Sequence, residues 1–160
     1  MLANRTSQQL LLDAAHGPML RVRSDVERKR LFGLAASAGS GSAVDGGIYQ
    51  PAASARTYRR LREVAETCLL AGWSVVVDAA FLKRAERSEF RHLANRLGAA
   101  FFILAPPAAP EQLRELIVAR LAKHHDASEA TPEVLAMQMR EIEALDSTER
   151  QSILENFLID

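Results

Sequence analysis

The stretch WSVVVDAAF, residues 73–81, decides the fold class of this chain. Its central valines form an unbroken apolar run instead of an alternating pattern. Such a run is typical of a strand that is buried on both faces, as in a parallel sheet. AAFFILA at 99–105 is a second run of this kind, and MLRVR at 19–23 is a shorter one. We therefore predict a parallel sheet that contains residues 19–23, 73–78 and 99–104.

Helical patterns alternate with these strands, which predicts right-handed crossovers between parallel strands. Pro51 suits the first turn of one helix, and Gly72 and Gly98 follow the ends of two others. FLID at the end of the chain is a candidate for one more short strand. The predicted helices cover 6–15, a segment that begins at Ser24 and Asp25 as its N-cap, 52–71, 84–97, 110–123, 132–144 and 147–156.

The composition is that of one soluble domain spanning residues 1–160, with no repeat and no internal boundary. Hydrophobic residues make up 48%, which is enough for a core, and 20 basic residues balance 20 acidic ones. A net charge of zero removes the usual electrostatic argument for non-specific binding of nucleic acid. Cys68 is the single cysteine, so we expect a small core residue and exclude sites built on several cysteines.

No apolar run approaches the roughly 20 residues that a membrane span needs. The first residues, MLANRTSQQLLLDAAHG, lack the charged and then apolar layout of a signal peptide. We therefore expect no membrane association and a location in the cytoplasm.

Asp25 directly follows the strand at 19–23, where ligands bind in open α/β sheets. A carboxylate there could act as general base toward a substrate hydroxyl. Arg28 lies one helical turn further on and could hold a phosphate or the substrate. The alternative is that Asp25 only caps a helix and Arg28 is a solvated charge.

Asp78 closes the run WSVVVD, so it too should lie at the carboxyl end of a strand. Acids at such positions hold magnesium through water in phosphoryl-transfer proteins. A strand-end aspartate can equally be a plain helix or turn cap.

Arg114 and Arg120 stand on the helix before HHDASEA, in a region of about 114–130 that could form a lid. Kinases of small substrates bring lid arginines over the transferring phosphate, although both residues could be ordinary exposed charges. His124 and His125 do not face one way on a helix and have no third ligand at metal-site spacing.

The phosphate-binding motif GxxxxGK[ST] is absent from the 160 residues. No lysine in the sequence follows a glycine or precedes Ser or Thr. The glycine-rich piece GSGSAVDGG at 39–47 has no lysine and no strand before it. The last residues of such a motif could fall at Arg5, Thr6 and Ser7, with arginine in the place of lysine, and its strand and glycine loop would then lie upstream of Met1.

Four blocks in this order resemble one bacterial family: RSDVERKRLFGL (23–34), GIYQPAASARTYRRL (47–61), WSVVVDAAFLKRAERSEFRHLANRLG (73–98) and DASEA (126–130). The family is the AAA-type ATP-binding, predicted-kinase domain that is often fused behind an aminoglycoside-phosphotransferase-like domain. More distantly, it is similar to polynucleotide 5′-hydroxyl kinases, zeta toxins and chloramphenicol phosphotransferase. The resemblance runs through nearly all of the chain.

This resemblance implies a three-layer, adenylate-kinase-like P-loop fold, with ATP and magnesium as cofactors. Asp25 and Arg28 match the family's base and substrate-binding arginine, and Asp78 matches its strand-end acid. Arg120 falls in the lid region, whereas Lys123 and the two histidines stand where the family usually shows another arginine. Since the family's first strand and phosphate loop are missing, we expect an N-terminally truncated domain.

The leading hypothesis is an ATP-dependent kinase domain for an unknown small-molecule or polynucleotide acceptor, inactive or incomplete as given. The alternatives are a non-catalytic remnant that binds a partner, such as an aminoglycoside-phosphotransferase-like domain, and a structural helical protein without a ligand. Missing the first strand, the sheet should also present an open edge through which copies of the chain could associate.

Overall fold

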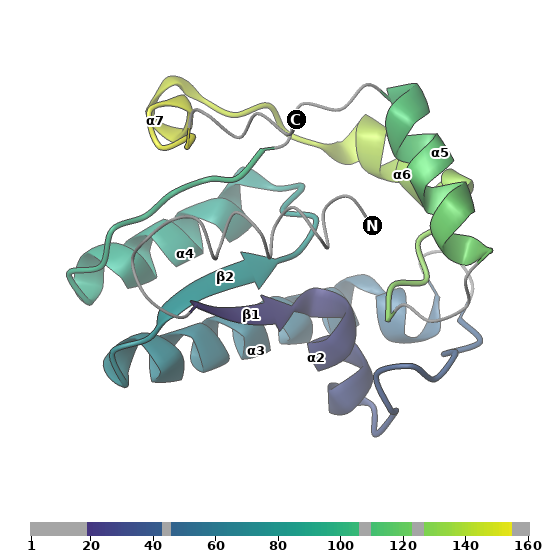
Figure 1. Cartoon of the computed structure of the whole chain (residues 1–160), viewed down its shortest axis with the longest axis horizontal. Helices are drawn as coiled ribbons and strands as arrows, with labels where there is room; N and C mark the ends of the chain where they lie inside the picture. Colours follow the sequence, from purple (N-terminus) through teal and green to yellow (C-terminus); the bar gives the residue numbers. More distant parts are fainter. Residues whose placement is uncertain (1–18, 43–45, 106–109, 123–126, 155–160) are drawn as a thin grey trace.

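The computed structural model describes residues 19–42, 46–105, 110–122 and 127–154 (Figure 1). The predicted helix at 6–15 and the predicted strand at 157–160 lie outside the described residues, as do Arg5 and Thr6.

Two parallel strands, β1 (Met19–Arg23) and β2 (Ser74–Asp78), form the sheet of the described residues. Their register pairs Met19 with Ser74 and Arg23 with Asp78, so both strands end at the same edge. The predicted strands at 19–23 and 73–78 are therefore confirmed. The chain between them passes through helices, as the predicted crossover requires.

The helices of the described residues surround this pair of strands (Figure 1). In Figure 1, α2 and α3 lie below the strands, and α5, α6 and α7 lie above them. The elements are α2 (Ser24–Leu31), the 3₁₀ turn η1 (Gly47–Tyr49), α3 (Pro51–Leu70), α4 (Arg84–Arg96), α5 (Pro110–Leu121), α6 (Pro132–Glu141) and α7 (Ser147–Arg150).

The last two helices are shorter than predicted, because tertiary hydrogen bonds replace the helical ones. Beyond α6, the N–H of Glu143 donates to the carbonyl of Leu82 at 2.8 Å instead of continuing the helix. Beyond α7, the chain turns into a bridge at Ile153. The predictions of helices over 132–144 and 147–156 were therefore wrong at their carboxyl ends.

The predicted strand at 99–104 is also wrong. In this segment Ile103 alone forms a parallel bridge, to Ile153, through hydrogen bonds of 2.8 Å to the Ser152 carbonyl and 3.1 Å from the Leu154 N–H. An apolar run indicates burial, but a strand forms only where a neighbour offers a ladder of hydrogen bonds. Phe101 still packs against the core, so the apolar pattern did mark a packed segment.

The core lies between one face of the sheet and the helices α3 and α4. Its buried members come from β1, α3 and α4, and they are Val22, Leu61, Ala65, Phe90 and Leu93. Val77, the register partner of Val22, packs on the same cluster. Arg21 and Arg23 alternate with Val22 and so belong to the opposite face. All five β2 residues are half-buried, which is less than the expected burial on both faces.

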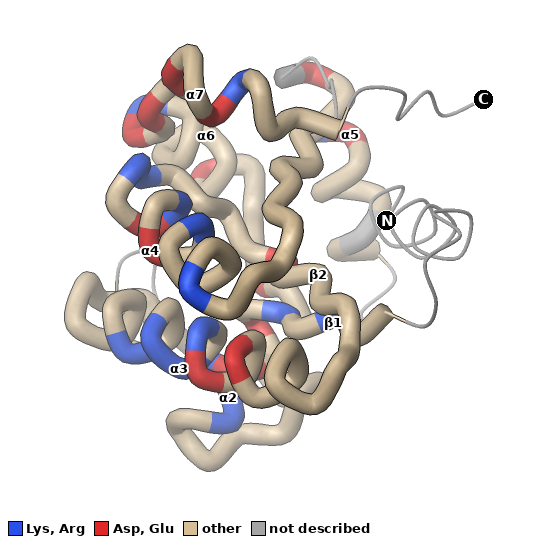
Figure 2. The backbone as a smooth tube through the Cα atoms, turned by 90° about the vertical axis from the view of Figure 1, so that its left-hand side faces the viewer, with Lys and Arg blue, Asp and Glu red and all other residues tan. Residues whose placement is uncertain are grey.

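Charged residues line α3 and α4, mostly basic on α3 and of both signs on α4 (Figure 2). Arg62 pairs with Glu89 at 2.5 Å and Arg96 with Glu66 at 2.7 Å, so ion pairs join the two helices. Cys68, on α3, is half-buried and its thiol is free. No helix among the described residues is both long and apolar enough to cross a bilayer.

Candidate functional site

Asp25 and Asp78 both lie at the carboxyl edge of the sheet. Asp78 is the last residue of β2, and its register partner is Arg23, two residues before Asp25. The two carboxylates are close enough for the charge of Asp78 to contribute to raising the pKa of Asp25. The structure thus brings these two predicted site residues together.

Asp25 lies inside the first turn of α2 and does not cap it. The helix begins at Ser24, and the residue in the N-cap position is Arg23, which makes no side-chain capping bond. The expectation that Ser24 and Asp25 form the N-cap was therefore wrong, because β1 runs directly into the helix. Burial raises the pKa of Asp25 above its ordinary value, while a hydrogen bond from Ser128 opposes this rise.

Arg28 is buried, and so it is not a solvated surface charge. Its Nη1 donates to the Ile48 carbonyl at 2.9 Å and to Ser54 Oγ at 3.2 Å. The guanidinium lies over the ring of Tyr49 at 5.1 Å. Burial lowers the pKa of Arg28, and the charge of Asp25 opposes this effect. The arginine is thus held rigidly one turn from Asp25.

Asp78 is paired with arginines from the neighbouring strand. Its Oδ2 accepts from Arg21 Nε at 3.1 Å and also from Arg21 Nη2, and Arg23 Nε lies 3.7 Å away. A magnesium ion needs carboxylate and water oxygens that are free to face it, and two guanidinium groups repel a cation. This arrangement does not fit a magnesium ion. Among the described residues, no group of three His, Cys, Asp or Glu side chains is placed to hold a metal.

The segment 127–130 reaches the site from the predicted lid region. The Ser128 hydroxyl hydrogen-bonds to Asp25. Glu129 accepts from the Ser40 N–H at 2.8 Å and from Ser40 Oγ at 2.5 Å, and its Oε1 lies 3.0 Å from Lys29 Nζ. Burial raises the pKa of Glu129, but the hydrogen bonds from Ser40 and Lys29 outweigh burial, and the net shift is downward.

Sequence reasoning missed Lys29, Ser40 and Glu129. Lys29 and Ser40 are far from Glu129 in the chain, so no local pattern joins them. The available signal for Lys29 was its spacing: it follows Asp25 by four residues and therefore lies on the same face of the helix. Ser40 lies in the glycine-rich stretch that was excluded as a nucleotide loop.

The lid arginines are not brought to this edge by any described contact. Arg114 is exposed on α5. A hydrogen bond with Thr131 is the main cause that lowers the pKa of Glu133 on α6, and the charge of Arg114 contributes less. Arg120 also stands on α5, but its side chain lies outside the described set, as do residues 123–126 with the two histidines.

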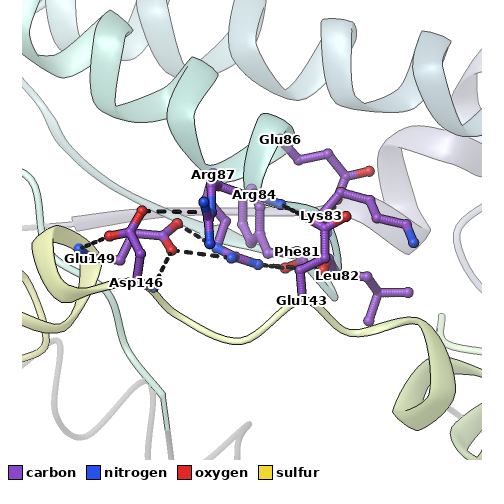
Figure 3. Close-up of polar contacts among 9 residues, drawn as sticks. All are labelled: Phe81, Leu82, Lys83, Arg84, Glu86, Arg87, Glu143, Asp146 and Glu149. Carbon is purple, nitrogen blue, oxygen red and sulfur yellow. Dashed lines mark hydrogen bonds and ion pairs between the residues drawn. The ribbon is translucent and has the colours of Figure 1, made fainter.

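A clasp between Arg87 and Glu149 holds the chain that follows Asp78 (Figure 3). The two side chains, 6% and 3% exposed, form hydrogen bonds of 2.6 and 3.2 Å. Arg87 Nη1 also donates to the Phe81 carbonyl at 2.9 Å. The Arg87 hydrogen bonds lower the pKa of Glu149 to about 2. The clasp thus ties α4, α7 and the connection after β2 into one unit.

A comparison with protein-family models matches residues 5–145 to the AAA domain. The chain belongs to the AAA domain family. Comparisons with curated proteins and with solved structures found no match. The fold of this AAA domain is the α/β P-loop fold, which agrees with the parallel pairing of β1 and β2 and with the helices around them. The match also identifies the chain as a nucleotide-binding, kinase-like or ATPase type of domain.

The candidate site of this AAA domain is a set of polar side chains at one edge of the sheet. Asp25, Arg28 and the segment 127–130 form a polar group at the carboxyl edge. The nucleotide side would require GxxxxGK[ST], which the sequence does not contain.

Proposed function

We propose that this AAA domain is a kinase-type phosphotransferase domain, and that Asp25 and Arg28 form its acceptor side. The observation that carries the proposal is the placement of Asp25. It is a carboxylate at the carboxyl edge of a parallel sheet, with its pKa raised by burial and a buried arginine one turn away. A general base works best when its pKa approaches the working pH, which favours a raised carboxyl pKa.

In this proposal, Asp25 accepts the proton of an acceptor hydroxyl as the hydroxyl oxygen attacks a phosphoryl group. The acceptor gains the phosphoryl group, and the phosphoryl donor keeps the electrons of the bond that breaks. Arg28 orients the acceptor, since a guanidinium fixed by Ile48 and Ser54 loses little freedom on binding. Ser128 keeps the Asp25 carboxylate oriented between turnovers.

The phosphoryl donor is ATP by family resemblance, but these 160 residues lack the usual cradle for it. A phosphate loop binds through successive backbone N–H groups and a lysine. Arg5 and Thr6 remain candidates for the end of such a loop, and Arg114 and Arg120 for lid contacts to the nucleotide. Magnesium is implied by the family, yet the pairing of Asp78 with Arg21 opposes it. We infer that residues 1–160 alone bind ATP weakly or not at all, since they contain no GxxxxGK[ST].

The test is phosphoryl transfer from ATP by a chain extended through any in-frame codons upstream of Met1. Codons for an apolar strand and GxxxxGK[ST] would supply the missing cradle, and a stop codon there would contradict the kinase proposal. Acceptors for the assay are small-molecule alcohols and 5′-hydroxyl oligonucleotides.

We expect Asp25→Asn to reduce transfer by the roughly 10²- to 10⁴-fold that general bases contribute. ATP affinity should stay unchanged, because Asp25 lies on the acceptor side. Glu133→Gln, which removes an exposed carboxylate on α6, is the matched control and should keep full activity. Equal activity of Asp25→Asn and the control would refute the role of Asp25.

A second candidate is a non-catalytic module that binds a partner, and the pairing of Arg21 and Arg23 with Asp78 favours it. A strand-end acid neutralised in this way is unsuited to metal chemistry. In this case the partner would be an aminoglycoside-phosphotransferase-like domain, in the cytoplasm. Co-purification of the two domains without nucleotide binding by the extended chain would support it over the kinase proposal.

A further inference from the structure

Donors from two separate segments converge on the carboxylate of Glu129. Both of its oxygens are engaged, Oε1 by the Ser40 N–H and Lys29 Nζ, and Oε2 by Ser40 Oγ. The Lys29 side chain is 2% exposed, and a buried ammonium group requires an anion beside it. Glu129 supplies this anion.

Two further buried donors, on Tyr49 and on Arg28 above its ring, extend this group. Arg28 Nε is buried and has no hydrogen-bond partner among the described residues. The Tyr49 hydroxyl is also buried and lies at Glu129. Tyr49 lies under the Arg28 guanidinium, and burial together with the charge of Glu129 raises its pKa. A carboxylate has two oxygens, both of which are already engaged. A phosphate group brings more acceptor oxygens and could satisfy these donors as well.

These contacts place an anion bound at Lys29 near Asp25. Asp25 and Lys29 are four residues apart on α2, so they lie on one helical face with their Cβ atoms about 5–6 Å apart. Adjacent residues of the segment 127–130 bind them, Ser128 to Asp25 and Glu129 to Lys29. A small molecule with a hydroxyl and a phosphate at that separation would contact the same two residues.

We propose that Lys29, Ser40, Tyr49 and Arg28 Nε form a binding site for the phosphate group of a small hydroxyl-bearing phosphate ester. Glu129 occupies this site until the ligand displaces it. The placement of the ester's hydroxyl at Asp25 rests on the proposed acceptor function, whereas the anion site itself does not depend on it.

The first test titrates inorganic phosphate into the full chain by calorimetry. Because Glu129 competes with phosphate for the site, the apparent affinity for phosphate equals the intrinsic affinity multiplied by the fraction of molecules in which Glu129 has left the site. If the open state is populated at about 10% or less, Glu129→Gln should bind phosphate at least about tenfold more tightly than the natural chain. Glu133→Gln makes the same change in net charge and should bind like the natural chain. No gain in Glu129→Gln, or an equal gain in both variants, overturns the proposal.

A second test needs no substitution and so does not depend on how well Glu129→Gln folds. A glutamyl endopeptidase cleaves after exposed glutamates, and phosphate should release Glu129 from Lys29 and Ser40. We expect phosphate to accelerate cleavage after Glu129 and to leave cleavage after Glu133 unchanged. Cleavage after Glu129 that does not respond to phosphate contradicts the proposal.

Binding of glycerol 1-phosphate and of ADP tests which kind of molecule carries the phosphate group that the site binds. We expect the ester to bind Glu129→Gln more tightly than inorganic phosphate does, with the advantage lost in Asp25→Asn/Glu129→Gln. If the ester has no advantage while phosphate still binds, the anion site stands and the acceptor role of Asp25 fails. Tighter binding of ADP than of the ester overturns the assignment to a hydroxyl-bearing ester.

Discussion

At the scale of single residues, burial decides which charges of α2 form a site. The sequence RSDVERKRL reads as a charged helix, and its spacing predicted Asp25 and Arg28 as neighbours on one face. In the structure Arg28 is buried and Asp25 is half-buried. The burial of Lys29 could not be predicted, because its ammonium group depends on the Ala36 carbonyl and on Glu129, which is remote in sequence.

The Arg87–Glu149 clasp supports a prediction about stability. Removing one partner of a buried pair leaves an uncompensated buried charge, which costs about 3–5 kcal/mol. We expect Arg87→Ala to lower the free energy of unfolding by about this amount in urea titrations, since both side chains are almost fully buried.

Arg62→Ala is the matched control, because Arg62 forms an equally short but exposed pair with Glu89. Exposed pairs contribute about 0–1 kcal/mol, so the loss should be small. Equal losses for the two variants would show that the clasp does not contribute as a buried pair.

Among the helices and strands, local sequence signals predicted where α3 begins and ends, but they did not predict which segments pair as strands. Pro51 and Gly72 placed α3 to within one residue of its observed ends. The segment 99–105 was predicted as a strand from its apolar run, but pairing depends on a neighbour that no local pattern reveals. The ends of α6 and α7 were overestimated for the same reason, since contacts with Leu82 and Ile103 redirect the chain.

Gly72 offers a test of the local argument at the end of α3. Its φ of +83° is a left-handed conformation, and an added Cβ would meet no atom within 4 Å. The cost of Gly72→Ala is therefore conformational, roughly 1–2 kcal/mol of unfolding free energy by thermal or urea denaturation.

Gly39→Ala is the comparison, since an added Cβ at Gly39 also meets no atom within 4 Å and its φ lies outside the left-handed region. It should be neutral or slightly stabilising. A cost at Gly39 as large as that at Gly72 would contradict the conformational explanation.

At the scale of the whole molecule, the described sheet is small for the apolar surface that it carries. β2 has one strand neighbour among the described residues, and the bridge between Ile103 and Ile153 is separate from it. Trp73 and Phe102 are 43% and 59% exposed. Unpaired strand edges with apolar neighbours promote association with other chains.

We therefore expect the isolated chain to self-associate as its concentration rises, measured by size-exclusion chromatography with light scattering. Phe102→Lys should reduce this association, because it places a charge in the exposed apolar segment 99–105 next to the bridge at Ile103. Val118→Lys, an equally apolar-to-charged change at a 53% exposed position on α5, should have little effect. A monodisperse monomer at all concentrations would refute the expectation.

We propose above that these 160 residues carry the acceptor side of a kinase-type AAA domain without a phosphate cradle. The family match and the parallel sheet support the fold, whereas the nucleotide side is missing from the sequence itself. An arginine at residue 5 does not replace a loop of backbone donors.

The decisive experiment is the calorimetric titration of magnesium-ATP into the chain of residues 1–160. We expect no binding, or binding too weak to saturate at millimolar ATP, which corresponds to a binding free energy weaker than about −4.1 kcal/mol. A micromolar dissociation constant for magnesium-ATP would contradict it.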